Sequence, residues 1–204
     1  MTDYIIKVKT IPIENIDKLA EEKFAANSLT SKICVIGIYN KKLKEYVFIE
    51  NSNESKLLSA FWQYVHQDND IIRLIGWNSR LFDIPMLYQR TLITKTELKD
   101  FRFPLPMDLS TFREKNYSDG IILDLADFWR CGRVNKADKL YNMAIAFNLF
   151  ENDTERQFFL SQELGYKDFY SNWVNSNSEN RINSSKEFLK LQLRVIDQLM
   201  EYLV

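Results

Sequence analysis

The apolar positions along the chain fall into short runs and spaced stripes, which predict strands alternating with helices. Runs of β-branched and aromatic residues such as KICVIGIYN are typical of strands buried on both faces of a sheet. Near the N-terminus, YIIKVKTIPI predicts a strand of about six residues that Pro12 ends, because proline cannot donate to a sheet. Strands are predicted within residues 4–13, 32–40, 45–50 and 70–78. The NKK turn after the second of them makes the second and third strands a hairpin.

Apolar residues three or four positions apart predict amphipathic helices in the rest of the chain. In NESKLLSAFWQYVHQ, residues 53–67, the leucines, Phe61 and Val65 follow this spacing, and Ser52 or Asn53 caps the helix. Further helices are predicted over residues 83–94, with Pro85 in the first turn, 137–149 and 185–203. Residues 15–26 predict a short helix or an ordered loop, and residues 120–129 a strand or a strand that runs into a helix.

The resulting order, β-β-β-α-β-α-β-α-α, predicts an α/β domain with a mixed sheet, because a leading hairpin is antiparallel and helix-linked strands are parallel. The 204 residues suit one domain over 1–204. Residues 150–185 are polar and rich in Asn and Ser, and we interpret them as a variable insertion.

Composition excludes some classes of protein but does not identify one. Apolar residues make up 46% of the chain, enough for a sizeable core, and the net charge is −1. A nucleic-acid interface must therefore rest on a local patch, and Arg73, Arg80, Arg90 and Arg102 are scattered as on a solvated surface. A single His66 excludes a multi-histidine zinc site and argues against a Ser-His-Asp triad.

The cysteines and the hydropathy pattern indicate an intracellular protein. Cys34 and Cys131 fit no metal-ligand spacing, and we expect two buried, reduced thiols. No stretch approaches the ~20 apolar residues of a membrane span, and the N-terminus lacks the apolar region of a signal peptide. We therefore expect a cytoplasmic protein without a membrane partner.

One stretch, GWNSRLFDIPML at residues 76–87, places a carboxylate where a helix turn is otherwise apolar. Asp83 lies two residues before Pro85, so it suits the N-cap of the following helix. A metal ligand is the other interpretation, because hard cations take carboxylate oxygens.

This block, the first strand and hairpin, ILDLADFW and the last helix resemble the 3′–5′ exonucleases of the ribonuclease H-like (DEDD) superfamily. The chain is most similar to the predicted exonucleases related to the proofreading domain of family-B DNA polymerases. The resemblance implies a five-stranded sheet in the order 3-2-1-4-5, flanked by helices, with strand 1 central. It also implies that Asp83 stands where the family holds a metal, and that Asn78 lines the substrate cleft.

The family's other metal-binding carboxylates do not stand at the matching positions of this chain. Where the family's first strand carries Asp-x-Glu-Thr, a hydrophobic residue and Pro, this chain reads KVKTIP, which puts Lys7 and Lys9 at the carboxylate positions. Where the last helix carries Tyr-x-x-x-Asp, this chain has Phe188 and Gln192. Asp83 is then the only retained ligand position.

Hydrolysis with two metal ions needs all four carboxylates. The resemblance therefore implies a degenerate site without a cofactor. Mg²⁺ or Mn²⁺ would be the ions of an active member. Asp197 cannot replace Gln192, because five residues turn it about 140° around the helix.

Each remaining candidate residue has a structural and a functional interpretation. Lys7 and Lys9 face solvent on an amphipathic strand, or they lie at the former metal site, pairing with Asp83 or with phosphate. Asp124 is more typical of a structural residue than of a catalytic one. Trp77, like Trp129 and Trp173, stacks on bases or anchors the core.

We therefore expect a pseudoenzyme rather than a hydrolase, with binding as the surviving role. The first hypothesis is a single nucleic-acid strand held by Lys7, Lys9, Asn78 and Trp77. An alternative is a scaffold or regulatory subunit that binds a protein partner. Its apolar patch would come from the predicted insertion, from Phe158, Phe159, Phe169 and Trp173. A third is an active nuclease with relocated ligands, Asp83 with Asp124 and a Glu from residues 14–22.

Overall fold

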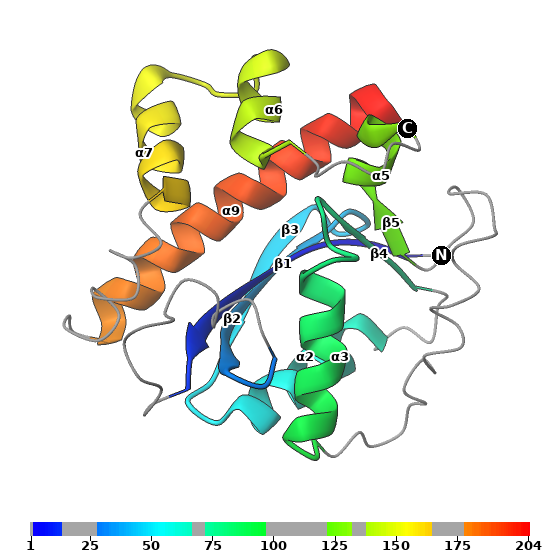
Figure 1. The fold of residues 1–204 in the computed structure, drawn as a ribbon, viewed down its shortest axis with the longest axis vertical. Helices are drawn as coiled ribbons and strands as arrows, with labels where there is room; N and C mark the ends of the chain where they lie inside the picture. The colour runs from blue at the N-terminus through cyan, green and yellow to red at the C-terminus, as the bar shows by residue number, and fades with distance from the viewer. Residues whose placement is uncertain (1, 14–27, 67–71, 97–121, 132–137, 165–177) are drawn as a thin grey trace.

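A mixed five-stranded sheet in the order β3-β2-β1-β4-β5 forms the centre of the molecule, which confirms the α/β fold and the strand order implied by the resemblance. The computed structural model describes residues 2–13, 28–66, 72–96, 122–131, 138–164 and 178–204 (Figure 1). The strands are β1 (Thr2–Pro12), β2 (Ser31–Asn40), β3 (Glu45–Glu50), β4 (Ile72–Gly76) and β5 (Ile122–Asp124). The helices are α2 (Glu54–His66), α3 (Asp83–Ile93), α5 (Leu125–Arg130), α6 (Leu140–Ala146), α7 (Asp153–Leu164) and α9 (Ser178–Leu203).

The central strand β1 is longer than its sequence predicts and is paired unequally on its two sides. It runs for 11 residues instead of about six, and it pairs antiparallel with β2 as far as Pro12, its last residue. Its parallel pairing with β4 covers only Thr2 to Ile5. The second half of β1 therefore lacks β4 beside it, and other groups must accept its backbone N–H donors on that side.

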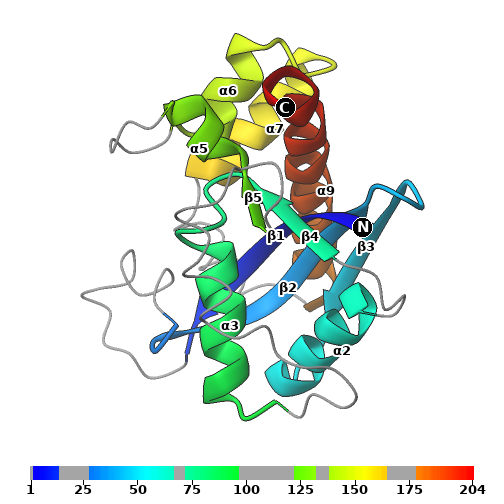
Figure 2. The ribbon, with the colours of Figure 1, turned by 90° about the vertical axis from the view of Figure 1, so that its right-hand side faces the viewer.

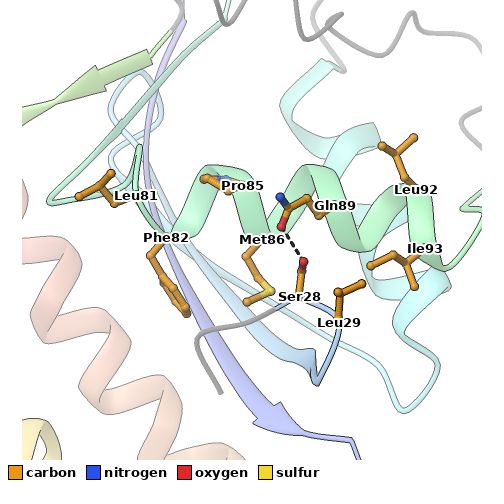
Figure 3. Close-up of a pocket in the computed structure, with 9 residues that line it drawn as sticks. All are labelled: Ser28, Leu29, Leu81, Phe82, Pro85, Met86, Gln89, Leu92 and Ile93. Carbon is orange, nitrogen blue, oxygen red and sulfur yellow. Dashed lines mark hydrogen bonds between the residues drawn. The ribbon is translucent and has the colours of Figure 1, made fainter. Parts of the chain in front are cut away.

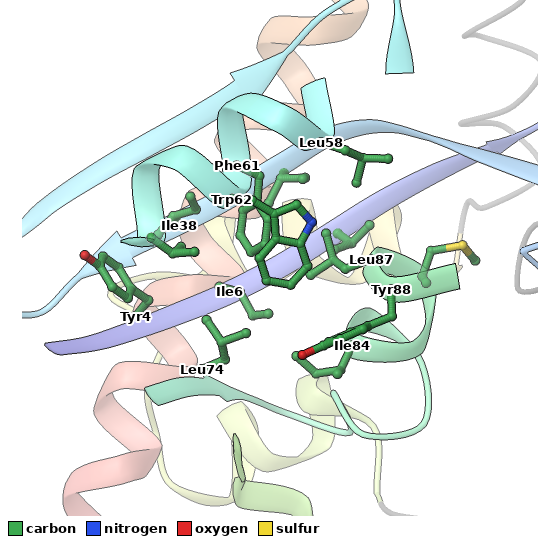
Figure 4. Close-up of a cluster of buried hydrophobic side chains, with 14 of the residues drawn as sticks. Tyr4, Ile6, Ile38, Leu58, Phe61, Trp62, Leu74, Ile84, Leu87 and Tyr88 are labelled. Carbon is green, nitrogen blue, oxygen red and sulfur yellow. The ribbon is translucent and has the colours of Figure 1, made fainter. Parts of the chain in front are cut away.

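Alternate residues of β1 enter two separate cores, one on each face of the sheet. Helices α2 and α3 cover one face, and α9 crosses the other together with α6 and α7 (Figures 1 and 2). Tyr4, Ile6 and Val8 pack in the first core around the fully buried Trp62, and Figure 4 shows this cluster. Ile5 packs in the second core, beneath α9. Lys7, two residues further on, therefore projects from the α9 face of the central strand.

A buried ion pair joins helices α2 and α3 to the start of β2. Arg90 donates to both carboxylate oxygens of Glu54 and to the carbonyl oxygen of Ser28. Glu54 also accepts the backbone N–H of Ile33 at 2.6 Å. The prediction of a solvated surface was wrong for Arg90, which is 5% exposed, because its guanidinium donates to groups of two other segments, Glu54 of α2 and Ser28 before β2.

Several boundaries differ from those predicted by the apolar pattern. The segment predicted as a polar insertion contains α7, and α9 begins at Ser178 instead of residue 185. Helix α7 buries Phe159 but few other apolar side chains, so its stripe is too narrow to stand out in the sequence. Residues 120–129 form a strand that runs into a helix, as β5 and α5. The prediction for residues 15–26 lies outside the described residues.

The two cysteines occupy different environments, and the expectation of two buried thiols was correct only for Cys34. Cys131 is exposed, because it ends α5 in the left-handed conformation with φ 49° and projects beyond the core. Both are free thiols. Within the described ranges, no helix is both long and apolar enough to cross a bilayer.

We predict that Arg90→Met lowers the free energy of unfolding by about 3–5 kcal/mol, because it leaves the buried carboxylate of Glu54 without its cation. The matched control is Lys186→Met, which removes the partly exposed ion pair with Glu50 and should cost under about 1 kcal/mol. Urea titrations of both variants measure the difference. Equal midpoints for the two variants would contradict the structural role of the buried pair.

Candidate functional site

The candidate site consists of Lys7, Lys9, Asp83, Phe188 and Gln192, the five positions that the resemblance places at the family's catalytic residues. Lys7 and Lys9 share one face of β1, since they are two residues apart on a strand. Residue pairing with β2 shifts between Lys9 and Thr10, where Cys34 adds an extra residue to β2. Such a bulge bends the strand and redirects neighbouring side chains, so Lys9 lies at an irregular point of the central strand.

Asp83 is fully buried, and two groups of β1 occupy its carboxylate. Lys7 Nζ donates to Oδ2 at 2.7 Å, and the backbone N–H of Val8 donates to Oδ1 at 2.8 Å. Lys7 Nζ also lies 3.5 Å from the carbonyl oxygen of Trp77. The hypothesis that Asp83 caps helix α3 was wrong: Phe82 is the N-cap residue, without a side-chain hydrogen bond, and Asp83 is the first residue of the helix.

The carboxylate of Asp83 replaces the missing part of strand β4. Val8 lies beyond Ile5, the last residue of β1 that pairs with β4, and its N–H would otherwise be buried without an acceptor. A buried N–H without an acceptor costs about 1–3 kcal/mol, so Asp83 has a structural function in addition to its charge. The chain reverses sharply before it, and Gly76 is required there because a Cβ would lie 2.6 Å from Cβ of Ser79.

Lys9 lies over an aromatic ring in an environment that disfavours its charge. Its Nζ is 4.1 Å from the centre of the Phe188 ring, a cation–π contact. Burial lowers the pKa of Lys9 to about 8, and the positive charge of Lys7 acts in the same direction. Cys34, Asp83 and Glu163 oppose this shift. The charge of Lys7 thus reaches Lys9, and Lys7 itself forms the ion pair with Asp83, the first residue of α3.

Helix α9 places Phe188 and Gln192 one turn apart, and both are buried. Phe188 packs against Phe158 and Phe159 of α7, with ring centres 6.4 and 5.2 Å away. Gln192 is 6% exposed, and its Oε1 has no hydrogen-bond partner among the described residues. Asp197 is bound by Lys41, at the turn between β2 and β3, which agrees with its exclusion from the site.

The block that follows β4 is organised around Asp124, which is a structural residue, as expected. Its carboxylate accepts the backbone N–H groups of Asn78, Arg80 and Ala126 at 2.7, 2.9 and 3.1 Å, the last as the N-cap of α5. Asn78 adopts the left-handed conformation with φ 58°, and its Oδ1 has no hydrogen-bond partner among the described residues. Asp124 therefore holds the backbone of this turn through two contacts and caps α5 through the third.

Trp77 does not present a ring for base stacking, contrary to the hypothesis from the sequence. It is 4% exposed, packs in the second core, and donates from Nε1 to the carbonyl oxygen of Asp138 at 2.9 Å. The alternative, that Trp77 anchors the core, is the one that the structure shows.

Glu163, in the last turn of α7, is a charged neighbour of the site that the sequence did not reveal. Burial raises the pKa of Glu163, while Lys139, Lys9 and Lys7 lower it. The charges of both site lysines therefore reach this carboxylate. No motif marks Glu163, and α7 itself was not predicted, so only the tertiary structure brings it to the site.

The residues present do not fit the pair of divalent ions that the resemblance implies for active members. Both oxygens of Asp83 are occupied by donors from β1, and the matching strand positions carry ammonium groups. In the part of the chain that the structure describes, no three His, Cys, Asp or Glu side chains lie together as a metal-binding group. Of the other ligands suggested for a relocated site, Asp124 already accepts hydrogen bonds from backbone N–H groups. Residues 14–22 lie outside the described ranges.

Comparisons with known proteins agree with this geometry at the level of the fold and family. Residues 25–139, more than half of the chain, match the family model of a predicted 3′-5′ exonuclease related to the exonuclease domain of PolB. The structure is similar to that of the family B DNA polymerase from the hyperthermophilic archaeon Pyrobaculum calidifontis, with a TM-score of 0.65 and 12% identity. The match covers 99% of this chain but 24% of the polymerase chain, and at this identity it shows the fold alone. A search of curated protein sequences finds no significant match.

We predict that Asp83→Ala destabilises the fold by about 3–5 kcal/mol, because it leaves Lys7 and the Val8 N–H without their buried acceptor. The control Asp197→Ala, which removes a more exposed ion pair with Lys41, should cost under about 1 kcal/mol. Urea titration measures both. A rise in the melting temperature of the unaltered protein with about 1 mM Mn²⁺ that disappears in Asp83→Ala would show a metal site and contradict the ion pair.

Proposed function

This chain belongs to the family of predicted 3′-5′ exonucleases related to the exonuclease domain of PolB, and we propose that it binds a single nucleic-acid strand at the candidate site without hydrolysing it. The observation that carries the proposal is the ion pair of Lys7 with Asp83, in which an ammonium group contacts the one retained carboxylate. This ion pair opposes metal-dependent hydrolysis, whereas lysine charges at the same site favour the binding of a nucleic-acid strand.

The loss of hydrolysis follows from what two-metal catalysis requires. Two divalent ions activate the attacking water and stabilise the leaving oxygen, and carboxylates must hold both ions. Here Lys7 supplies a positive charge to Asp83 directly, at 2.7 Å. An ammonium neutralises the carboxylate, but it has no open coordination position on which water could become a nucleophile. The site is stable without the metal and has no means to perform the metal's step.

Strand binding is supported by the lysine charges at the candidate site and by the side-chain amide of Asn78. Lysine ammonium groups bind phosphate oxygens, and phosphate contacts supply most of the affinity of sequence-independent binding. Two lysines on one face of the central strand provide this charge, although the net charge of the chain is −1. Asn78, whose amide oxygen has no partner in the described part of the chain, adds a polar group beside them.

A second candidate function, a scaffold that binds a protein partner, is favoured by an apolar groove along α3. The groove has a volume of about 600 Å³, and Figure 3 shows the side chains that line it. Its exposed apolar members include Leu29, Leu81 and Leu92, between 64% and 74% exposed. The patch expected within the predicted insertion differs, because Phe159 is fully buried and Phe158 half-buried against α9, while Phe169 and Trp173 lie outside the described residues.

We predict that the purified protein does not shorten a labelled single-stranded DNA or RNA oligonucleotide in Mg²⁺ or Mn²⁺. Three of the four metal-binding carboxylates are absent. When residues act as one catalytic unit, the loss of several of them leaves little activity. Gel analysis of the 3′-labelled and 5′-labelled strands detects stepwise cleavage. Shortening from the 3′ end that Asp83→Ala abolishes would overturn the non-hydrolytic proposal.

For strand binding, we predict an affinity that falls with salt and depends on Lys9. Lys9→Glu should weaken binding and reduce the slope of log affinity against log salt by about 0.7, the value of one phosphate contact on a single strand. The matched control is Lys42→Glu, an equal charge reversal at an exposed turn. Lys7 is left unchanged, because its loss would expose the buried charge of Asp83 and destabilise the fold.

Fluorescence anisotropy on single-stranded DNA and RNA between about 50 and 300 mM salt measures these affinities. No binding at the lowest salt would eliminate the nucleic-acid proposal and leave the scaffold. Equal effects of the Lys9 and Lys42 variants would place the strand away from the candidate site.

A further inference from the structure

Trp129 is the one tryptophan among the described residues whose ring is exposed, and neither the core nor the candidate site accounts for it. It is 39% exposed, whereas Trp62 and Trp77 are 0% and 4% exposed. Trp129 belongs to α5, which follows the edge strand β5 (Figure 2). A tryptophan that is apolar on its faces and held at its N–H is typical of a binding surface.

Contacts through Trp77 and Asp138 connect this exposed ring to the candidate site. Nε1 of Trp129 donates to the carboxylate of Asp138 at 2.8 Å, and Nε1 of Trp77 donates to the backbone carbonyl oxygen of the same residue at 2.9 Å. The carbonyl oxygen of Trp77 in turn lies 3.5 Å from Nζ of Lys7. The edge-to-face contact of Trp129 with Phe147, with ring centres 6.0 Å apart, and the Asp138 hydrogen bond together hold the ring in one orientation.

Guanidinium groups lie on one side of Trp129. Arg130, the next residue, and Arg80, from the turn after β4, pair with the same carboxylate of Asp127. One carboxylate neutralises only one of the two guanidinium groups, so this side of the ring keeps a positive charge. The planar fork of an arginine suits phosphate oxygens, with which it forms charge-assisted hydrogen bonds.

Ammonium groups lie on the other side, between Trp129 and the candidate site. Lys139 is exposed at the N-cap of α6, directly after the residue that holds the indole. Burial raises the pKa of Glu163, and the charges of Lys139 and of both site lysines oppose this rise, so all three reach one carboxylate. Cationic side chains therefore continue from the candidate site toward the exposed ring.

We propose that Trp129 stacks on a base of the single nucleic-acid strand bound at the candidate site. The inference rests on the proposed function, which brings the strand to Lys7 and Lys9. Cationic side chains that follow the backbone, together with an aromatic ring for the bases, are the arrangement by which proteins bind single strands without reading their sequence. Trp129 thus has the stacking role that the buried ring of Trp77 cannot perform.

The test compares two exposed aromatic side chains that pack against the same neighbour. Trp129 and Tyr202 both contact Phe147, with ring centres 6.0 and 5.1 Å away, and Tyr202 is 61% exposed. Glu201 precedes Tyr202, whereas Arg130 follows Trp129, so phosphates are repelled beside one ring and attracted beside the other. Trp129→Ala and Tyr202→Ala each remove a contact to Phe147, but only the first removes a stacking ring.

Fluorescence anisotropy measures the affinity of the full chain for a labelled single strand and for a strand of equal length that is abasic throughout. Trp129→Ala should weaken binding of the normal strand about 5- to 150-fold, which corresponds to the loss of one stacked base. The same variant should leave binding of the abasic strand unchanged, because that strand has phosphates but no bases. The slope of log affinity against log salt should also stay unchanged, because no phosphate contact is lost. Tyr202→Ala should change neither affinity.

Tryptophan fluorescence gives a second readout that a structural role of Trp129 would not move. A base stacked on the indole quenches its emission, so the normal strand should quench the protein and the abasic strand should not. Trp129→Phe keeps an aromatic ring for stacking, and we expect it to retain most of the affinity while the quenching disappears.

Three outcomes overturn the inference, and they differ in what they leave. Equal losses of affinity from Trp129→Ala and Tyr202→Ala, or an equal loss on the normal and abasic strands, eliminate stacking at Trp129. Strand binding that depends on Lys9 but not on Trp129 also eliminates it and leaves the proposed function. No binding of either strand by the unaltered protein eliminates the inference and the proposed function together.

Discussion

One buried carboxylate, Asp83, joins the central strand to helix α3 at the point where strand β4 ends. It accepts a charged hydrogen bond from Lys7 and a neutral one from the backbone of Val8. Loss of one member of a buried ion pair costs about 3–5 kcal/mol, a large part of the ~5–15 kcal/mol that holds a domain folded. The position of α3, and hence the first core beneath it, depends on this contact.

The same contact supplies positive charge to the Asp83 carboxylate from within the chain. A site with several carboxylates needs a cation, because like charges in a low dielectric repel. In this chain the cation is covalently attached, as the ammonium group of Lys7. Because Lys7 is part of the chain, its contribution to the stability of the site does not depend on the concentration of a free ion.

The sequence predicts the sheet well, because strand order follows from long apolar runs and from the resemblance. Through the resemblance it also singles out Lys7 and Asp83, which the structure joins in an ion pair. It cannot decide between a cap and an ion pair for Asp83, since Lys7 lies 76 residues away and both explanations suit the local pattern. Helix α3 begins at Asp83, one residue earlier than a cap at Asp83 would allow, and its N-cap is Phe82.

Tertiary packing determines the features that the sequence predicts wrongly. Trp77 follows a strand and could face either way, and its burial depends on contacts made by residues beyond position 137. Arg90 and Glu54 look like surface charges, 36 residues apart, until α2 and α3 bring them together. Glu163 belongs to a helix with too few apolar residues to be predicted, so its charge near the lysines could not be anticipated.

Lys7, Lys9 and Asp83 form a set in which each charge sets the environment of the others. Asp83 holds Lys7 in place, and the charge of Lys7 in turn disfavours the charge of Lys9. Phe188 acts in the opposite direction, because its cation–π contact favours the charged form of Lys9. These contacts give the central strand two lysines in unlike environments, Lys7 paired with a buried carboxylate and Lys9 buried against an aromatic ring.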